Sequence, residues 1–203
     1  MKSYLDFDVL AKDNIRTLKL PTTVFRRPVV FILVGLPVSG KTTLIHKLTD
    51  KFPLTILSEE DMSAFLSPGA TIFQRNSPEV FQLALKTIEL LVRMDKACIY
   101  DANVKTMEQR KLIKQVVEDA GGSYTLIYLN CSKEGCYKRL QKHNLAVEGG
   151  EAKGFILNKD LFEFETSSTD LPTTEEAHLV YNSEDPESSY QLFPQVEKII
   201  NGK

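Results

Sequence analysis

The sequence predicts an α/β fold in which helices cover both faces of a parallel sheet. Two observations support this fold class. Short apolar segments alternate with longer amphipathic segments, which is the pattern of repeated strand–helix–strand crossovers. The first apolar segment, residues 29–34, reads VVFILV without a polar interruption, as expected of a strand covered on both faces. Five strands are expected, at residues 29–34, 54–57, 97–100, 124–129 and 178–181.

Helices are expected between these strands, and several have their own start signals. Ser77 before Pro78 is an N-cap followed by a first-turn proline. Thr106 and Gln109 have the spacing of a capping box, and the glycine pair at 121–122 ends that helix. The expected helices lie at 42–51, 78–95, 106–120, 132–143, 154–165 and 187–201, the last one interrupted at Pro194.

The composition is that of a globular chain without a dominant charge. Of the 203 residues, 42% are apolar, and 25 Lys and Arg nearly balance 27 Asp and Glu for a net charge of −2. This balance argues against a general electrostatic affinity for nucleic acid or membrane. The three cysteines have no zinc-binding spacing, so we expect reduced thiols.

The N-terminal ten residues contain acids where a signal peptide needs an apolar core. No apolar run approaches the roughly 18 residues of a membrane span. We therefore expect a cytoplasmic protein with no membrane partner. No linker divides the chain, so the expected organisation is an N-terminal lead-in at 1–27 followed by a single domain at 28–203.

The stretch GLPVSGKT, which follows the first strand, matches the phosphate-binding loop, or P-loop, pattern. Its glycines allow several backbone N–H groups to point at one anion, and the start of the next helix adds the positive end of its dipole. Lys41 is expected to reach the β- and γ-phosphates, the Thr42 hydroxyl to ligate Mg²⁺, and Thr43 to meet the α-phosphate. The nucleotide-binding residues are expected to be Gly35, Pro37, Val38, Ser39, Gly40, Lys41, Thr42 and Thr43.

A P-loop does not define a reaction, and other motifs narrow the choice. Selection of guanine would need Asn-Lys-x-Asp, whereas residues 158–161 read NKDL, with the acid one place early. A mechanical ATPase usually has two adjacent acids after its magnesium strand, whereas the third strand here ends in IYDAN, with one acid. These motifs favour ATP over GTP and disfavour a mechanical ATPase.

The stretch CIYDANVKTMEQRKLI at 98–113, taken with GLPVSGKTTL, resembles the polynucleotide-kinase-like and zeta-toxin-like group of P-loop kinases. The resemblance covers roughly residues 29–145, with a weaker match at 162–182. It implies a three-layer P-loop NTPase fold with a five-stranded parallel sheet and a mobile lid, here at about 132–160. It also implies transfer of the γ-phosphoryl group of ATP to a hydroxyl group, with magnesium.

The resemblance also implies roles for individual residues. Members of the group place a catalytic acid after the second strand, where this chain reads LSEEDMSAFL. Glu60 falls at the acid position in an ungapped alignment and Asp61 is its neighbour, although such acids are also favoured at any helix start. Ser63 stands where the group often has an arginine, and Arg75 is the candidate to supply that charge to the substrate.

Two further positions follow from the same resemblance. Asp101, at the end of the third strand, is expected to organise a magnesium-bound water or to orient the acceptor, and Asn103 to bind the substrate. On the expected lid helix, Arg139 is the candidate to stabilise charge in the transition state and Lys142 a second nucleotide contact. A solvated basic helix face is the competing interpretation of these two cations.

The leading hypothesis is therefore an ATP-dependent kinase whose acceptor is a nucleic-acid end, a nucleotide-sugar or a small metabolite. Acidic residues in the C-terminal part of the chain favour a small acceptor or a short nucleic-acid end. Two alternatives stay open. One is a nucleotide-gated ATPase or binding module that acts through a protein partner, which Ser63 in place of arginine favours. The other is a pseudoenzyme that binds ATP as structure only.

Overall fold

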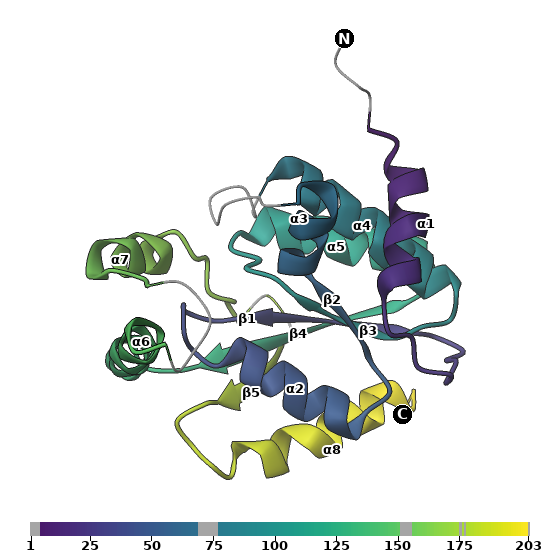
Figure 1. Cartoon of the computed structure of the whole chain (residues 1–203). Helices are drawn as coiled ribbons and strands as arrows, with labels where there is room; N and C mark the ends of the chain where they lie inside the picture. The colour runs from purple at the N-terminus through teal and green to yellow at the C-terminus, as the bar shows by residue number, and fades with distance from the viewer. Residues whose placement is uncertain (1–4, 69–76, 151–155, 175, 177, 203) are drawn as a thin grey trace.

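The computed structural model describes residues 5–68, 77–150, 156–174, 176 and 178–202 (Figure 1). Five strands form one parallel sheet in the order β2-β3-β1-β4-β5. The predicted α/β fold with a five-stranded parallel sheet is confirmed. The strands are β1 (Val29–Val34), β2 (Thr55–Ser58), β3 (Cys98–Asp101), β4 (Ser123–Asn130) and β5 (His178–Asn182).

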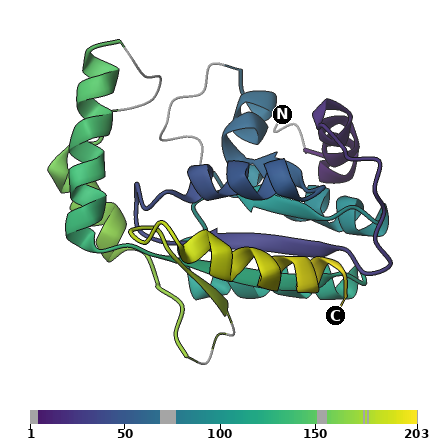
Figure 2. The ribbon, with the colours of Figure 1, turned by 90° about the horizontal axis from the view of Figure 1, so that it is seen from below.

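Helices lie on both faces of this sheet. In Figure 1, α1 (Phe7–Thr17), α3 (Glu59–Leu66), α4 (Pro78–Arg93) and α5 (Met107–Asp119) cover the upper face. Below the sheet lie α2 (Lys41–Lys51) and α8 (Ser188–Ile200). Two more helices, α6 (Lys133–Glu148) and α7 (Lys159–Ser167), stand beyond the end of the sheet, which Figure 2 shows most clearly for α6.

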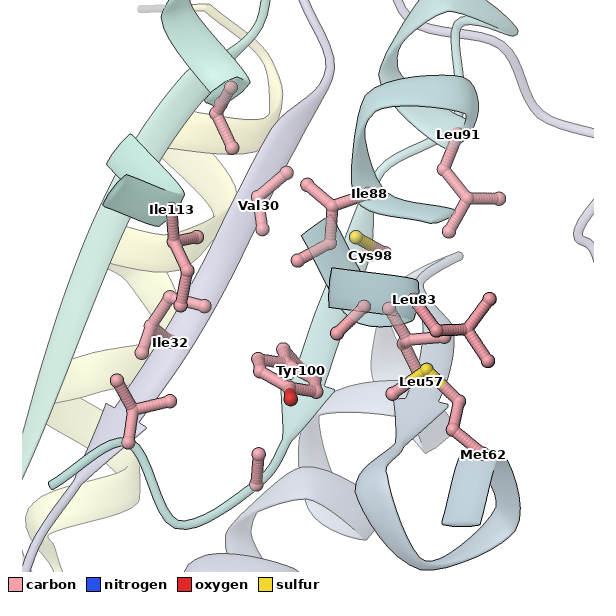
Figure 3. Close-up of a cluster of buried hydrophobic side chains, with 14 of the residues drawn as sticks. Val30, Ile32, Leu57, Met62, Leu83, Ile88, Leu91, Cys98, Tyr100 and Ile113 are labelled. Atoms are coloured by element: carbon pink, nitrogen blue, oxygen red, sulfur yellow. The ribbon is translucent and has the colours of Figure 1, made fainter. Parts of the chain in front are cut away.

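The central strand β1 explains the two-sided core. All six of its side chains are buried. Alternate residues enter opposite clusters, because successive side chains of a strand point to opposite faces. Val30, Ile32 and Val34 join the cluster under α4 and α5, part of which Figure 3 shows, whereas Val29, Phe31 and Leu33 join the cluster with α2 and α8.

Most predicted element boundaries agree with the structure within a few residues, and the helix caps are as expected. Ser77 accepts a hydrogen bond from the Val80 amide, and Thr106 and Gln109 form a complete capping box. One expectation is wrong: α8 runs through Pro194 without a break. Leu192 and Val196, on either side of the proline, are both fully buried, and this packing holds the helix together.

The sequence did not predict α1, within the polar lead-in. Asp6 caps this helix with its side chain, and Ala11 and Ile15 are buried in the cluster that also contains α4. The buried Asn14 accepts a hydrogen bond from the Thr87 hydroxyl of α4 over 3.5 Å. The lead-in thus contributes one layer of the core above β3 rather than a loose tail.

Candidate active site

The turn between β1 and α2 has the backbone geometry of a phosphate-binding loop. Gly40 has φ 103°, a left-handed conformation that favours glycine. A Cβ atom on Gly35 would lie 2.9 Å from the Leu129 carbonyl oxygen and 2.8 Å from the Ser39 hydroxyl oxygen. Both glycines are therefore required by the shape of the turn, which leaves α2 with its N-terminus facing the end of the sheet.

Lys41 is the cation at the centre of this turn. Its Nζ donates to the carbonyl oxygens of Gly35 at 2.9 Å and Leu36 at 3.1 Å. Burial lowers the pKa of Lys41 to about 8, against the opposing charges of Asp101, Cys136 and Glu165. A bound phosphate would favour the charged form of this ammonium group, since an anion nearby raises a lysine pKa.

A cavity of about 620 Å³ opens in front of the loop, within the range of small-molecule sites. Gly40, Thr42 and Thr43 line one part of it. Lys47 of α2 and Ser183, just after β5, line it too. Of the predicted P-loop contacts, Gly35, Pro37 and Ser39 do not line the cavity, and Ser39 is fully buried.

Helix α6 brings Arg139 to the P-loop. Its guanidinium donates to the Ser39 carbonyl oxygen at 2.8 Å, to the Ser183 hydroxyl at 3.0 Å and to the Ser183 carbonyl oxygen at 2.6 Å. His143, one turn further along α6, also lines the cavity, whereas Lys142 is exposed and does not. His143 was not predicted, although its i, i+4 spacing from Arg139 is a sequence signal that could have placed both on one helix face.

Asp101, the last residue of β3, lies close enough to Lys41 for each charge to act on the other. It stands opposite Ser58 of β2 in the parallel register. Burial raises the pKa of Asp101, and the negative charges of Glu60 and Asp61 add to this, while Lys41 and His46 oppose it. Asp101 ends β3, as the sequence predicts, and its role in the site stays a prediction.

The acids after β2 occupy different environments. Ser58 caps α3 by accepting a hydrogen bond from the Asp61 amide. The two acids predicted from the sequence, Glu60 and Asp61, are exposed in the first turn of α3. The residue that the sequence reasoning missed is Glu59. Its side chain turns inward, and its Oε2 accepts a hydrogen bond from the Asn103 amide at 3.3 Å.

The electrostatic state of Glu59 differs from that of an ordinary surface acid. Burial raises its pKa to about 7, the charge of Asp101 adds to the rise, and the Asn103 hydrogen bond and Lys105 oppose it. A carboxyl group that titrates near neutral pH suits proton transfer. The letters EED give no signal for this, because which of three consecutive acids turns inward depends on the cap at Ser58.

Asn103 connects this acid with α7. Its side-chain amide donates to Glu165 Oε2 at 3.1 Å, and the same oxygen pairs with Lys105 Nζ at 2.6 Å. Glu165 also raises the pKa of Lys41. The structure therefore brings Asn103 to the acidic end of the sheet. The other predicted substrate contact, Arg75, lies outside the described residues.

Arg110, which lies in the stretch CIYDANVKTMEQRKLI at 98–113, does not line the cavity and pairs with Glu176. Its side chain is 1% exposed and forms two hydrogen bonds with the Glu176 carboxylate, at 2.7 and 2.8 Å. It also donates to the carbonyl oxygens of Asp170 and Lys105. It thus fastens the segment before β5 to α5. Ser63, where the resemblance expected an arginine, is buried on the inner face of α3.

Thr42 fits the expected magnesium contact. Its exposed side chain lines the cavity next to Lys41, and a hydroxyl oxygen is a hard ligand of the kind that Mg²⁺ takes together with phosphate oxygens and water. No helix in the described part of the chain is both long enough and apolar enough to cross a membrane.

With this geometry in place, comparison with known proteins identifies the family. A family model described as an AAA domain matches residues 30–153, which include the P-loop, Asp101 and all of α6. The chain belongs to this AAA domain family. An adenylate kinase of Chlamydia pneumoniae is 27% identical to this AAA domain protein over 126 residues, 55% of the chain. The chain spans 57% of the length of that relative.

Solved structures agree in fold. The protein APE1195 covers 88% of this AAA domain protein with a TM-score of 0.66 and 23% identity, over 99% of its own chain. The APS kinase CysC of Mycobacterium tuberculosis, in complex with AMPPNP and APS, covers 84% with a TM-score of 0.56 and 19% identity, over 96% of its own chain. At these identities the likeness shows a P-loop kinase-like fold.

Proposed function

We propose that this AAA domain protein is an ATP-dependent phosphotransferase that moves the γ-phosphoryl group of ATP to a hydroxyl group. The observation that carries the proposal is that Lys41 both lines a nucleotide-sized cavity and feels the charge of the Asp101 carboxylate, which does not line that cavity. A triphosphate on one side of this ammonium group and an acceptor on the other would meet in line. The matched adenylate kinase and the fold of an APS kinase support a kinase.

The P-loop residues would hold the nucleotide. Backbone N–H groups at 35–43 and the N-terminus of α2 face the phosphates, Lys41 pairs with the β- and γ-phosphates, and Thr43 contacts the α-phosphate. The Thr42 hydroxyl would hold Mg²⁺, which would neutralise part of the negative charge of the phosphate groups. Pro37 and Val38 shape the turn. We expect cytoplasmic ATP to be the donor.

The acceptor hydroxyl must lose its proton during attack. The new bond joins the acceptor oxygen to the γ-phosphorus, the bond from that phosphorus to the β,γ-bridging oxygen breaks, and ADP leaves with the electron pair. A carboxylate takes the proton. We propose Glu59 for this role, beside the sequence candidates Glu60 and Asp61, because Glu59 points inward and has the pKa near 7. Asp101 would orient the acceptor or a magnesium-bound water.

Residues 132–160, which contain α6 and the start of α7, would serve as the lid of the domain proposed at 28–203, against whose α4 the helix α1 of the lead-in packs. Arg139 already holds the P-loop through the Ser39 carbonyl oxygen, so its contribution would begin with positioning the loop. In this position the Arg139 guanidinium would also stabilise the negative charge that develops on the transferred phosphoryl group. Arg75 keeps its proposed role as a substrate contact, whereas Lys142 is exposed outside the cavity, which does not favour its proposed contact to the nucleotide.

The class of acceptor follows from the resemblance to polynucleotide-kinase-like and zeta-toxin-like kinases. A short nucleic-acid end, a nucleotide-sugar and a small metabolite are the proposed acceptors. The experiment is to incubate the protein with Mg²⁺ and ATP, with and without acceptor pools, and to measure ADP. Acceptor-dependent ADP together with a phosphorylated product supports the kinase. Slow release of ADP regardless of acceptor supports the partner-dependent ATPase module instead.

Variants separate the roles. Lys41→Ala should abolish ADP formation under either hypothesis. Glu59→Gln, Glu60→Gln and Asp61→Asn, measured side by side, identify the base: the correct one removes transfer, leaves ATP affinity within about threefold, and eliminates the rise in kcat through pH 7. If all three variants keep wild-type kcat, the base assignment is wrong.

A further inference from the structure

The charges on the acceptor side of the site indicate which acceptors it takes. This inference rests on the proposed function. The nucleotide cavity lies on the α2, α6 and β5 side of Lys41. In-line transfer therefore brings the acceptor to the opposite side, where β2 and β3 end and α7 approaches. We call this region, formed by Glu59, Asp101, Asn103, Lys105 and Glu165, the acceptor edge.

The acceptor edge is lined by carboxylates that lie close enough to perturb one another. Asp101 raises the pKa of Glu59, and the charges of Glu60 and Asp61 raise the pKa of Asp101. Glu165 adds a third inward-facing carboxylate, held by Asn103 at 3.1 Å. Carboxylates accept hydrogen bonds from hydroxyl and ammonium groups and repel other anions.

The cations described in this region already have partners. Lys105 is ion-paired with Glu165 at 2.6 Å. Arg110 is buried and satisfied by Glu176 and two carbonyl oxygens. Lys41 belongs to the P-loop and, on the proposed function, to the triphosphate. Within the described residues, an anionic acceptor would therefore have to displace Glu165 from Lys105 to gain a cationic partner.

A second, independent observation points to a hydroxyl-bearing ligand or an ordered water here. The hydroxyl of Tyr100 is buried, its residue only 1% exposed, and it has no hydrogen-bond partner among the described residues. The negative charge of Glu59 contributes to the raised pKa of Tyr100, after burial. Figure 3 shows its oxygen on the side of the ring away from Cys98, toward the carboxyl end of β3. Buried polar groups of this kind are normally satisfied by a partner or by water.

We propose that the acceptor is a small polyhydroxy compound without phosphate or carboxylate groups, a sugar or an amino sugar. Its hydroxyl and amino groups would donate to Glu59, Asp101 and Glu165. One of its hydroxyl groups forms the new bond to the γ-phosphorus as ADP leaves, and its proton passes to a carboxylate. This narrows the three acceptor classes above to the small metabolites and disfavours nucleic-acid ends and nucleotide-sugars.

The test uses the full chain with Mg²⁺ and ATP and a panel of hexoses, pentoses and amino sugars. Each is assayed beside its aldonic acid and its sugar phosphate, and a 5′-hydroxyl oligonucleotide is included. We expect kcat/KM for the best uncharged or amino sugar to exceed that of its acidic counterparts at least tenfold. The inference is overturned if anionic members or the oligonucleotide are preferred, or if ATP binds but no sugar stimulates ADP release. Absence of ATP binding would instead reject the proposed function.

A variant of the protein tests whether the carboxylates of the acceptor edge disfavour anionic acceptors. Glu165→Gln releases Lys105 and should lower the preference for uncharged over anionic acceptors at least fivefold, mainly through KM of the anionic member. Glu163→Gln, on the same helix and paired with Lys133, is the matched control and should leave that ratio unchanged. Equal ratios in wild type and Glu165→Gln would show that this carboxylate does not select the acceptor.

Discussion

Replacing Glu59 by glutamine should make the folded protein more stable at pH 8 than the wild type. The pKa of Glu59 rises from 4.5 in its unperturbed state to about 7 in the fold, chiefly through burial. For a group whose folded pKa is raised, the stabilising contribution is complete below the unfolded pKa and is lost as pH rises through the folded pKa. The cost in stability from Glu59 therefore builds up between about pH 4.5 and pH 7 and is complete above pH 7.

The magnitude follows from the shift. A difference of about 2.5 pKa units corresponds to about 3 kcal/mol, at about 1.4 kcal/mol per unit. Partial solvent access at the start of α3 reduces this, so we expect a difference of about 2 kcal/mol at pH 8. At pH 5 the neutral carboxyl and the amide are similar in shape, and both accept the Asn103 hydrogen bond, so the variants should agree within about 1 kcal/mol.

Urea unfolding at pH 5 and pH 8, without nucleotide, measures this difference directly. Glu108→Gln is the matched control, because Glu108 is an exposed acid in the first turn of α5, and its stability should follow the wild type at both pH values. The same Glu59→Gln protein should lose phosphoryl transfer, a gain in stability at the expense of activity. Equal pH dependence of wild type and Glu59→Gln would refute the inward, desolvated position of this carboxyl group.

Three further variants test the contacts that hold the segments around the site in place. Arg110→Ala leaves Glu176 without its buried partner and should cost about 3–5 kcal/mol of unfolding free energy by urea titration, whereas Lys114→Ala, in an exposed pair, should cost under about 0.5 kcal/mol. Gly35→Ala forces its Cβ against the Leu129 carbonyl oxygen and should lower thermal stability by about 1–3 kcal/mol and weaken ATP binding; unchanged affinity would contradict the close fit. Arg139→Lys loses the forked contacts to Ser39 and Ser183 and should weaken ATP binding about tenfold by calorimetry, with Lys138→Ala, exposed beside Glu134, as the unchanged control.

Local patterns predicted most of the fold. The uninterrupted apolar run of β1 predicted a strand covered on both faces, and the caps at Ser77 and Thr106 marked where α4 and α5 begin. Helix α1 was missed because its buried face depends on a distant partner, α4. The break predicted at Pro194 was wrong for a similar reason, because the packing of α8 against the core outweighs the local cost of a proline within the helix.

The site was predictable where the motif is contiguous and less so where it is assembled from distant segments. The P-loop residues and Asp101 lie where strand–turn–helix logic places them. Glu59 was missed because the sequence shows three adjacent acids and not the Asn103 amide that selects one. Lys142 was predicted as a nucleotide contact but is exposed, and His143, which was not predicted, lines the cavity, because the contacts of Arg139 set the rotation of α6.

The central claim is that the loop around Lys41 binds a triphosphate. Titration calorimetry of the full chain with a non-hydrolysable ATP analogue and Mg²⁺ tests it most directly. We expect saturable binding in the micromolar to millimolar range typical of such substrates, weakened at least thirtyfold in Lys41→Ala. Absence of binding to the wild-type protein, or equal affinity of the two proteins, would contradict the claim.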